Sequence, residues 1–217
     1  ILLFNHQRRH IQLFQEVRPA VQEGEIGELV QIEAECGNLY DWGTHWLDMM
    51  FFYNNDQPVE WVIGQINSQT KNVIFGAEME DQSVCHFKWK NGVRGYMVTG
   101  DEGKIGAVHR LIGTEGIIEV LSERKYRILG KGVGEWKTTE VPQGDWSDFA
   151  LAANEAVRVL DEPGYKPLVS SDNAIQSTEI IFATYRSSQI HGRVDLPLNY
   201  DGNGLLELME AGTIGYE

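Results

Sequence analysis

One short stretch of the sequence carries an acidic residue, a histidine and a second acidic residue at helical spacing. Asp41, His45 and Asp48 stand at positions i, i+4 and i+7, which places them on one face if residues 41–54 form a helix. A carboxylate one turn from an imidazole can orient the ring and raise its pKa. This arrangement is suited to acid/base chemistry near neutral pH, with His45 moving the proton and Asp41 orienting it.

Structural interpretations of the same residues stay open. Asp41 is a good helix N-cap, and His45 can be a hydrogen-bonded histidine of the core. Asp48 needs a polar partner if it is buried, and we expect its role to be structural. Gly43 lacks a side chain on the first helical turn, so that a ligand or another backbone segment can come close. The apolar residues around this motif, Trp42, Trp46, Met49, Met50, Phe51 and Phe52, are expected in a core or an interface.

The elements that must position this motif follow from hydrophobic periodicity. Helices are predicted over about 11–23, 41–54, 146–161 and 171–190, with a short one at 205–210. A strand is expected at 27–37, and several more between 59 and 141, with a hairpin turn at Asn91-Gly92. Strands and helices do not alternate regularly. The order predicts an α+β fold, a mostly antiparallel, open-faced sheet with helices on one face. The bare sheet face invites a second subunit, as a homodimer or tetramer.

Composition excludes several function classes. The 217 residues carry a formal net charge of −14, which disfavours nucleic acid and anionic membrane surfaces as partners. No apolar run of transmembrane length and no secretory signal occurs. The two cysteines, Cys36 and Cys85, form no metal-like or redox-like pair, and we expect reduced thiols in a cytoplasmic protein.

Other candidate sites are weaker. His6 and His10 stand four residues apart, but no third ligand with suitable spacing is visible, so no metal site is predicted. Residues 130–134 are glycine-rich but lie between predicted strands, and we interpret them as a loop and not as a dinucleotide-binding turn. Glu33 and Glu35 share one strand face, which favours a solvated surface.

Five segments and their order resemble one oxidoreductase family. Asp41, Gly43, His45 and Asp48 match the Asp-x-Gly-x-His-x-x-Asp helix in the second domain of the glucose-fructose oxidoreductase, inositol dehydrogenase and rhizopine-catabolism family (Gfo/Idh/MocA). Further resemblance lies in four short segments, at residues 5–9, 23–28, 113–116 and 168–171 together with 194–197. Each is weak alone, but their order is specific, and the resemblance extends over almost the whole chain.

The resemblance implies a reaction and roles for its residues. It implies NAD- or NADP-dependent hydride transfer at a CH–OH carbon of a sugar or polyol. His45 would be the acid/base, Asp41 would orient it or bind a substrate hydroxyl, and Arg8 would reach the substrate from the domain junction. A solvated charge at a helix start is the alternative for Arg8. The family's glycine-rich nucleotide turn and its Glu-Lys-Pro motif do not occur in this sequence.

The resemblance also implies a division of the chain. Residues 1–5 are expected to be the end of the last strand of an N-terminal Rossmann domain that this chain otherwise lacks, since the chain begins without methionine. Residues 6–198 would form the C-terminal substrate domain and residues 199–217 a tail. We expect such a chain to be inactive alone. The alternative is a noncatalytic carbohydrate-binding or oligomerisation module that needs no cofactor domain.

Overall fold

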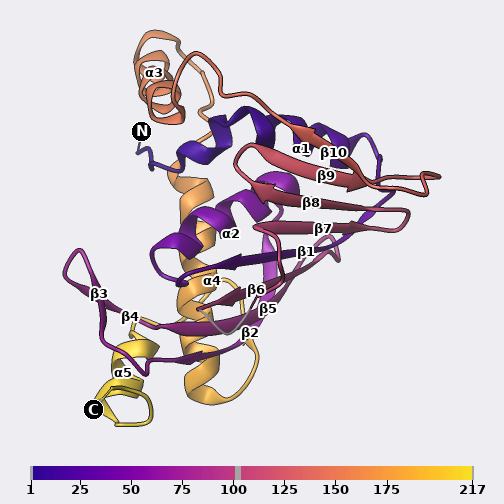
Figure 1. Cartoon of the computed structure of the whole chain (residues 1–217). Coiled ribbons are helices and arrows are strands. Elements are labelled where there is room, and N and C mark those ends of the chain that lie inside the picture. The colour runs from indigo at the N-terminus through magenta and orange to yellow at the C-terminus, as the bar shows by residue number, and fades with distance from the viewer. Residues whose placement is uncertain (1, 101–103, 217) are drawn as a thin grey trace.

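A single large sheet organises the protein. The computed structural model describes residues 2–100 and 104–216, and its main sheet has nine strands in the order β10-β9-β8-β7-β1-β6-β5-β2-β11 (Figure 1). A separate hairpin pairs β3 with β4. The strands are β1 (Leu29–Cys36), β2 (Val59–Asn67), β3 (Asn72–Ile74), β4 (Ala77–Met79), β5 (Gln82–Trp89), β6 (Arg94–Thr99), β7 (His109–Gly113), β8 (Ile117–Ser122), β9 (Lys125–Leu129), β10 (Lys137–Glu140) and β11 (Val194–Asp195).

The pairing is antiparallel except at the centre of the sheet. There, β1 pairs in parallel with β6 on one side and antiparallel with β7 on the other. The Asn91-Gly92 turn joins the antiparallel strands β5 and β6, as predicted, with Gly92 at a φ of 95°. The predicted α+β class with a mostly antiparallel sheet is thus confirmed.

Helices cover one face of this sheet and bury the core. The helices are the 3₁₀ helix η1 (Gln7–His10), α1 (Gln12–Gln22), α2 (Trp42–Tyr53), α3 (Asp148–Asp161), α4 (Ser171–Ile190) and α5 (Gly204–Glu210). Of these, α3 packs on η1 and α5 packs on α4. Figure 1 shows α1, α2 and α4 behind the sheet. Alternate strand residues such as Ile32 and Phe87 point into the core beneath them. No described helix combines the length and apolarity that a membrane crossing requires. Both cysteines are free thiols.

Some predicted elements differ from the structure. Residue 1 lies outside the described residues, and residues 2–5 form no strand; instead the Leu2 carbonyl oxygen accepts a hydrogen bond from the Ser171 amide at 3.1 Å. The β3–β4 hairpin was not predicted, because its strands have only three residues each. Of the tail, residue 217 is not described, while Leu205 and Leu208 of α5 join the common core.

The apolar residues of α3 do not all pack inward. Phe149, Val157 and Leu160 are exposed by 58%, 52% and 83%, although their spacing is typical of a buried helix face. The helix packs on η1 through Glu155, whose carboxylate accepts hydrogen bonds from the Tyr165 hydroxyl and the Leu168 amide. Polar contacts therefore position α3, and much of its apolar surface is uncovered.

At Gly113, the end of β7 lies very close to the backbone of the segment that precedes β1. A Cβ atom at this position would lie 2.1 Å from the Ile26 carbonyl oxygen, and backbone cannot move aside as a flexible side chain can. We expect Gly113→Ala to lower the free energy of unfolding by about 2 kcal/mol, measured by urea denaturation. Gly134→Ala is the matched control, since nothing lies within 4 Å of its added Cβ. Equal stability of the two variants would contradict this packing.

Candidate active site

The start of α2 is fixed by the loop that precedes it. The Asn38 side-chain oxygen accepts hydrogen bonds from the amides of Asp41 (2.9 Å) and Trp42 (3.0 Å). Asp41 occupies the N-cap position of α2, as expected, but its side chain makes no capping hydrogen bond, and the Asn38 side chain caps the helix instead. Asn38 can cap the helix because it lies three residues before Asp41, where its side-chain oxygen reaches the free N–H groups of both Asp41 and Trp42. The Asp41 carboxylate is left available for other contacts.

Gly43 and Glu80 hold this loop against the helix. A Cβ at Gly43 would lie 3.2 Å from the Asn38 carbonyl oxygen, so that the expected close approach is made by a backbone segment. The buried Glu80 carboxylate accepts hydrogen bonds from the Leu39 amide and the Tyr185 hydroxyl. Burial raises the pKa of Glu80. The N-terminal end of α2, with Asp41 and His45, is thereby tied to α4.

Asp48 is paired with an arginine from η1. Arg9 donates to its carboxylate from Nε at 2.8 Å and from Nη2 at 2.9 Å, and His6 Nδ1 lies 3.2 Å from Asp48 Oδ1. Asp48 is fully buried, and hydrogen bonds and charge from His6 and Arg9 outweigh desolvation and lower its pKa. Arg9 also contacts Asp56 at 2.7 Å. Asp48 therefore has the polar partners that its expected structural role requires. Arg9 lies 39 residues before Asp48 in the sequence.

His45 lies in a partly enclosed position next to His6. The two rings are 5.3 Å apart between centroids, and His45 Nδ1 is enclosed with no hydrogen-bond partner in residues 2–100 or 104–216. Desolvation, followed by the positive charges of Arg8 and His6, lowers the pKa of His45 to about 4. The imidazole is therefore neutral at pH 7.

This contradicts the expectation that Asp41 raises the His45 pKa. No hydrogen bond joins Asp41 to His45 in the part of the chain that the structure describes, and the only carboxylate that acts on the ring to raise its pKa is Asp48. Helical spacing brings Asp41 one turn from His45 but does not turn its carboxylate toward the ring. The contribution of Arg8, which is distant in sequence, could not be read from the motif.

Arg8 lies across the two tryptophans that flank His45. Its guanidinium carbon is 4.6 Å from the Trp46 ring centroid and 5.3 Å from that of Trp42, and Nε donates to Glu123 at 2.9 Å. Only 8% of Arg8 is exposed, so it is not the solvated charge of the alternative interpretation. The structure thus gathers Arg8, His45 and the start of α2 at one end of the sheet, and adds His6, Arg9 and Glu123, which the sequence did not indicate as site residues.

His6 and His10 have separate partners. His10 Nε2 lies 3.4 Å from Glu155 of α3, whereas His6 approaches Asp48 of α2. Within residues 2–100 and 104–216, no three His, Cys, Asp or Glu side chains are grouped so that they could hold a metal ion.

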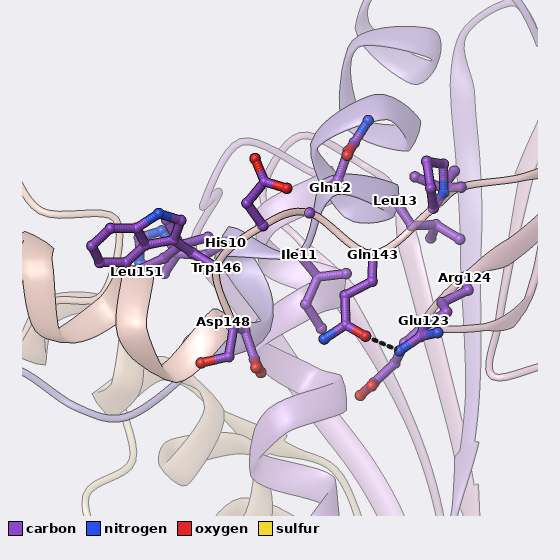
Figure 2. Close-up of a pocket in the computed structure, with 15 residues that line it drawn as sticks. His10, Ile11, Gln12, Leu13, Glu123, Arg124, Gln143, Trp146, Asp148 and Leu151 are labelled. Atoms are coloured by element: carbon purple, nitrogen blue, oxygen red, sulfur yellow. Dashed lines mark hydrogen bonds between the residues drawn. The ribbon is translucent and has the colours of Figure 1, made fainter.

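A cavity of about 350 Å³ opens beside this site (Figure 2). It lies between the start of α1, the β8–β9 turn and the loop from β10 to α3, and Figure 2 shows Arg124 hydrogen-bonded to Gln143 across it. Trp146 and Asp148 line its outer side. Asp41, His45 and Arg8 are not among its lining residues. Glu123, the partner of Arg8, connects this cavity to the α2 site.

The His45 ring gives a direct check on these electrostatics. We expect it to titrate with a midpoint near 4, measured by NMR of the labelled ring in this chain. Because the folded pKa lies below the ordinary value of 6.5, the unfolded chain binds more protons between pH 4 and 6.5. The contribution of His45 to stability is therefore fully present above pH 6.5 and is lost as the pH falls toward 4. A midpoint above 6.5 would restore the interpretation in which Asp41 holds the ring.

Comparison with known proteins gives one matching family and several solved structures with a similar fold. Residues 14–119 match the GFO/IDH/MocA C-terminal domain. An oxidoreductase from Agrobacterium radiobacter in complex with NAD+, L-tartaric acid and magnesium superimposes with a TM-score of 0.68 at 18% identity, covering 89% of this chain and 64% of that one. An aldose-aldose oxidoreductase from Caulobacter crescentus complexed with glycerol has a TM-score of 0.68 at 16% identity, covering 90% of this chain and 64% of that one.

A third solved structure is similar over the same part. An NAD-binding protein from Listeria innocua has a TM-score of 0.65 at 20% identity, covering 89% of this chain and 63% of its own. The chain thus spans less than two thirds of the length of these structures, and identities this low show a shared fold alone. No curated protein sequence matches this one. The match assigns residues 14–119 to the GFO/IDH/MocA C-terminal domain, and the fold and the motif at the start of α2 agree with this assignment.

Proposed function

We propose that this chain is the substrate-binding and catalytic half of an NAD- or NADP-dependent oxidoreductase that acts on a CH–OH group of a sugar or polyol. The observation that carries the proposal is the neutral, partly accessible His45 beside the fixed cation Arg8, in a GFO/IDH/MocA domain. The relatives solved with L-tartaric acid and with glycerol support a polyhydroxylated substrate.

The residues of this chain would bind the hydroxyl and move its proton. A neutral imidazole can accept the hydroxyl proton as the carbon is oxidised, and return it in the reverse direction. The fixed charge of Arg8 would bind and orient the polar substrate beside His45. The Asp41 carboxylate, which no capping bond engages, can accept a hydrogen bond from a neighbouring hydroxyl. A nicotinamide cofactor, when bound, would accept the hydride from the CH–OH carbon.

The described residues do not fit a dinucleotide. Residues 130–134 follow β9 and precede β10, so that no helix N-terminus stands behind these glycines to receive a pyrophosphate. We therefore propose that NAD or NADP binds to a separate nucleotide-binding domain, and that residues 6–198 form the substrate domain beside it. We expect this chain alone to turn over no substrate.

The mass of the native polypeptide tests this arrangement. An antibody against the chain should detect a band heavier than 24.6 kDa by one nucleotide domain, roughly 100–150 residues. A native band at 24.6 kDa would leave the site without a covalently attached cofactor domain and would favour a noncatalytic module.

The uncovered sheet face supports a second role in assembly. Arg127, Glu119, Arg110 and Glu33 form a row of cross-strand ion pairs on it, and the exposed Ile63 and Val84 lie farther along the same face. We propose that two copies pair through this face, as a homodimer or within a tetramer. Sedimentation should show a dimer or larger species that Val84→Arg converts to monomer, while Val133→Arg, on the β9–β10 loop, leaves assembly unchanged. A monomeric wild-type chain would contradict this role.

A further inference from the structure

Neighbouring side chains hold the Arg8 guanidinium in place but leave its two terminal nitrogens without a protein partner among the described residues. Its Nε is taken by Glu123, and its guanidinium plane is supported by Trp46 and Trp42. These contacts fix the side chain without engaging its two terminal nitrogens. Neither nitrogen donates a hydrogen bond to any of the residues 2–100 and 104–216, although 92% of the residue is removed from solvent. Both terminal nitrogens reach the protein surface, where water or a ligand can accept their hydrogen bonds.

The neighbouring arginine shows the contrast. Arg9 donates from Nε and Nη2 to Asp48 and from Nη1 and Nη2 to Asp56. All three of its nitrogens have carboxylate partners within the protein. Two consecutive arginines of η1 thus serve different purposes: Arg9 is fully paired and ties η1 to α2, whereas Arg8 keeps the two-pronged end of its guanidinium for something outside the described residues.

The surroundings of Arg8 leave positive potential at the site. The Glu123 side chain is 47% exposed, so that solvent screens its negative charge, and it contacts Nε alone. The negative charge of Asp48 is already paired with Arg9. The charge of Arg8 lowers the pKa of both His45 and the buried His109, on α2 and β7, after the larger effect of burial. The whole chain has a net charge of −14, but negative charge does not dominate the immediate surroundings of Arg8.

We propose that Arg8 anchors a carboxylate of the substrate, so that the site selects a sugar acid or another polyhydroxylated acid over the neutral sugar or polyol. The inference rests on the proposed function and makes its substrate class narrower. The terminal nitrogens of a guanidinium match the two oxygens of a carboxylate, and such a paired, charge-assisted contact is stronger than hydrogen bonds to a hydroxyl. The substrate carboxylate would bind to the terminal nitrogens of Arg8, and a hydroxyl farther along the substrate would reach His45.

Matched acid and neutral ligands test this assignment. The ring signals of His45 are followed by NMR in this chain during titration with D-galacturonate and D-galactose, and with D-glucuronate and D-glucose. Each pair shares its ring hydroxyls and differs only at its last carbon, which is a carboxylate in the acid and a CH2OH group in the neutral sugar. We expect the acid of at least one pair to shift the His45 signals with an affinity tenfold or more above its neutral partner. Arg8→Gln should abolish this preference, and Arg8→Lys should retain part of it.

Control variants distinguish a failure of the carboxylate anchor from a failure of the proposed function. Arg124→Gln removes a positive charge from the same β8–β9 turn that carries Glu123 and should keep the preference, and the amide spectrum of each variant reports folding. Equal binding of the acid and neutral members, or a preference that survives in folded Arg8→Gln, overturns the carboxylate anchor and leaves the proposed function standing. If no member of either pair shifts the His45 signals, the anchor and the substrate site both fail.

Discussion

Replacing His45 by alanine is expected to lower kcat at least about 100-fold in the polypeptide that joins this chain to a nucleotide-binding domain. The physical reason is the loss of the neutral imidazole that accepts the hydroxyl proton, since removing a positioned acid/base group costs two to four decades in rate. The measurement is steady-state turnover with a nicotinamide cofactor and a saturating substrate. The loss should lie in kcat more than in KM, because the proton moves only in the chemical step.

His191 offers a matched control for that experiment. It ends α4 with a φ of 54°, so that His191→Asn keeps a residue that tolerates this backbone conformation and removes an imidazole far from α2 in sequence. This variant should retain normal turnover. If His45→Ala turned over substrate at the wild-type rate, His45 would not be the acid/base.

The second large effect is expected at Asp48. Asp48→Ala should lower the free energy of unfolding by about 3–5 kcal/mol, because it leaves the Arg9 guanidinium buried without its main partner. The effect is measured by urea denaturation at pH 7, where the carboxylate is ionised in the native protein.

Two further variants define the origin of this loss. Asp56→Asn should cost less, since Asp56 is 30% exposed and is the second partner of Arg9. Replacing both members, as Arg9→Met with Asp48→Leu, should cost less than Asp48→Ala alone, because no uncompensated charge remains. A loss below about 1 kcal/mol in Asp48→Ala would show that the buried pair does not hold η1 to α2.

Local signals in the sequence predicted most of the elements of this fold. The Asn91-Gly92 turn and the Ser170 start of α4 need only neighbouring residues, and both occur where expected. The central place of β1 could not be predicted, because strand order depends on contacts that periodicity does not contain. Its parallel pairing with β6 joins Gln31 to Arg94, 63 positions along the chain. The exposed apolar face of α3 likewise shows that amphipathic spacing indicates a helix without saying what covers it.

The candidate site was predicted in part, and for a similar reason. The spacing of Asp41, His45 and Asp48 placed them on α2, and the resemblance drew attention to Arg8. The pairing of Arg9 with Asp48, the contact of His6 with both Asp48 and His45, and the effect of Arg8 on the His45 pKa all join residues that are 30 or more positions apart. A motif read along the chain indicated Asp41 as the partner of His45, whereas the folded protein buries this ring next to Arg8, and both burial and the Arg8 charge lower its pKa.

Nicotinamide reduction by the native polypeptide, purified with an antibody against this chain, is the decisive measurement. It is followed by the absorbance of the reduced nicotinamide with NAD and NADP and a panel of sugars, polyols and their acids. We expect turnover that depends on both the cofactor and a CH–OH substrate. A native polypeptide that binds nicotinamide dinucleotide but oxidises no member of the panel, and reduces none of the corresponding carbonyl compounds, would contradict it.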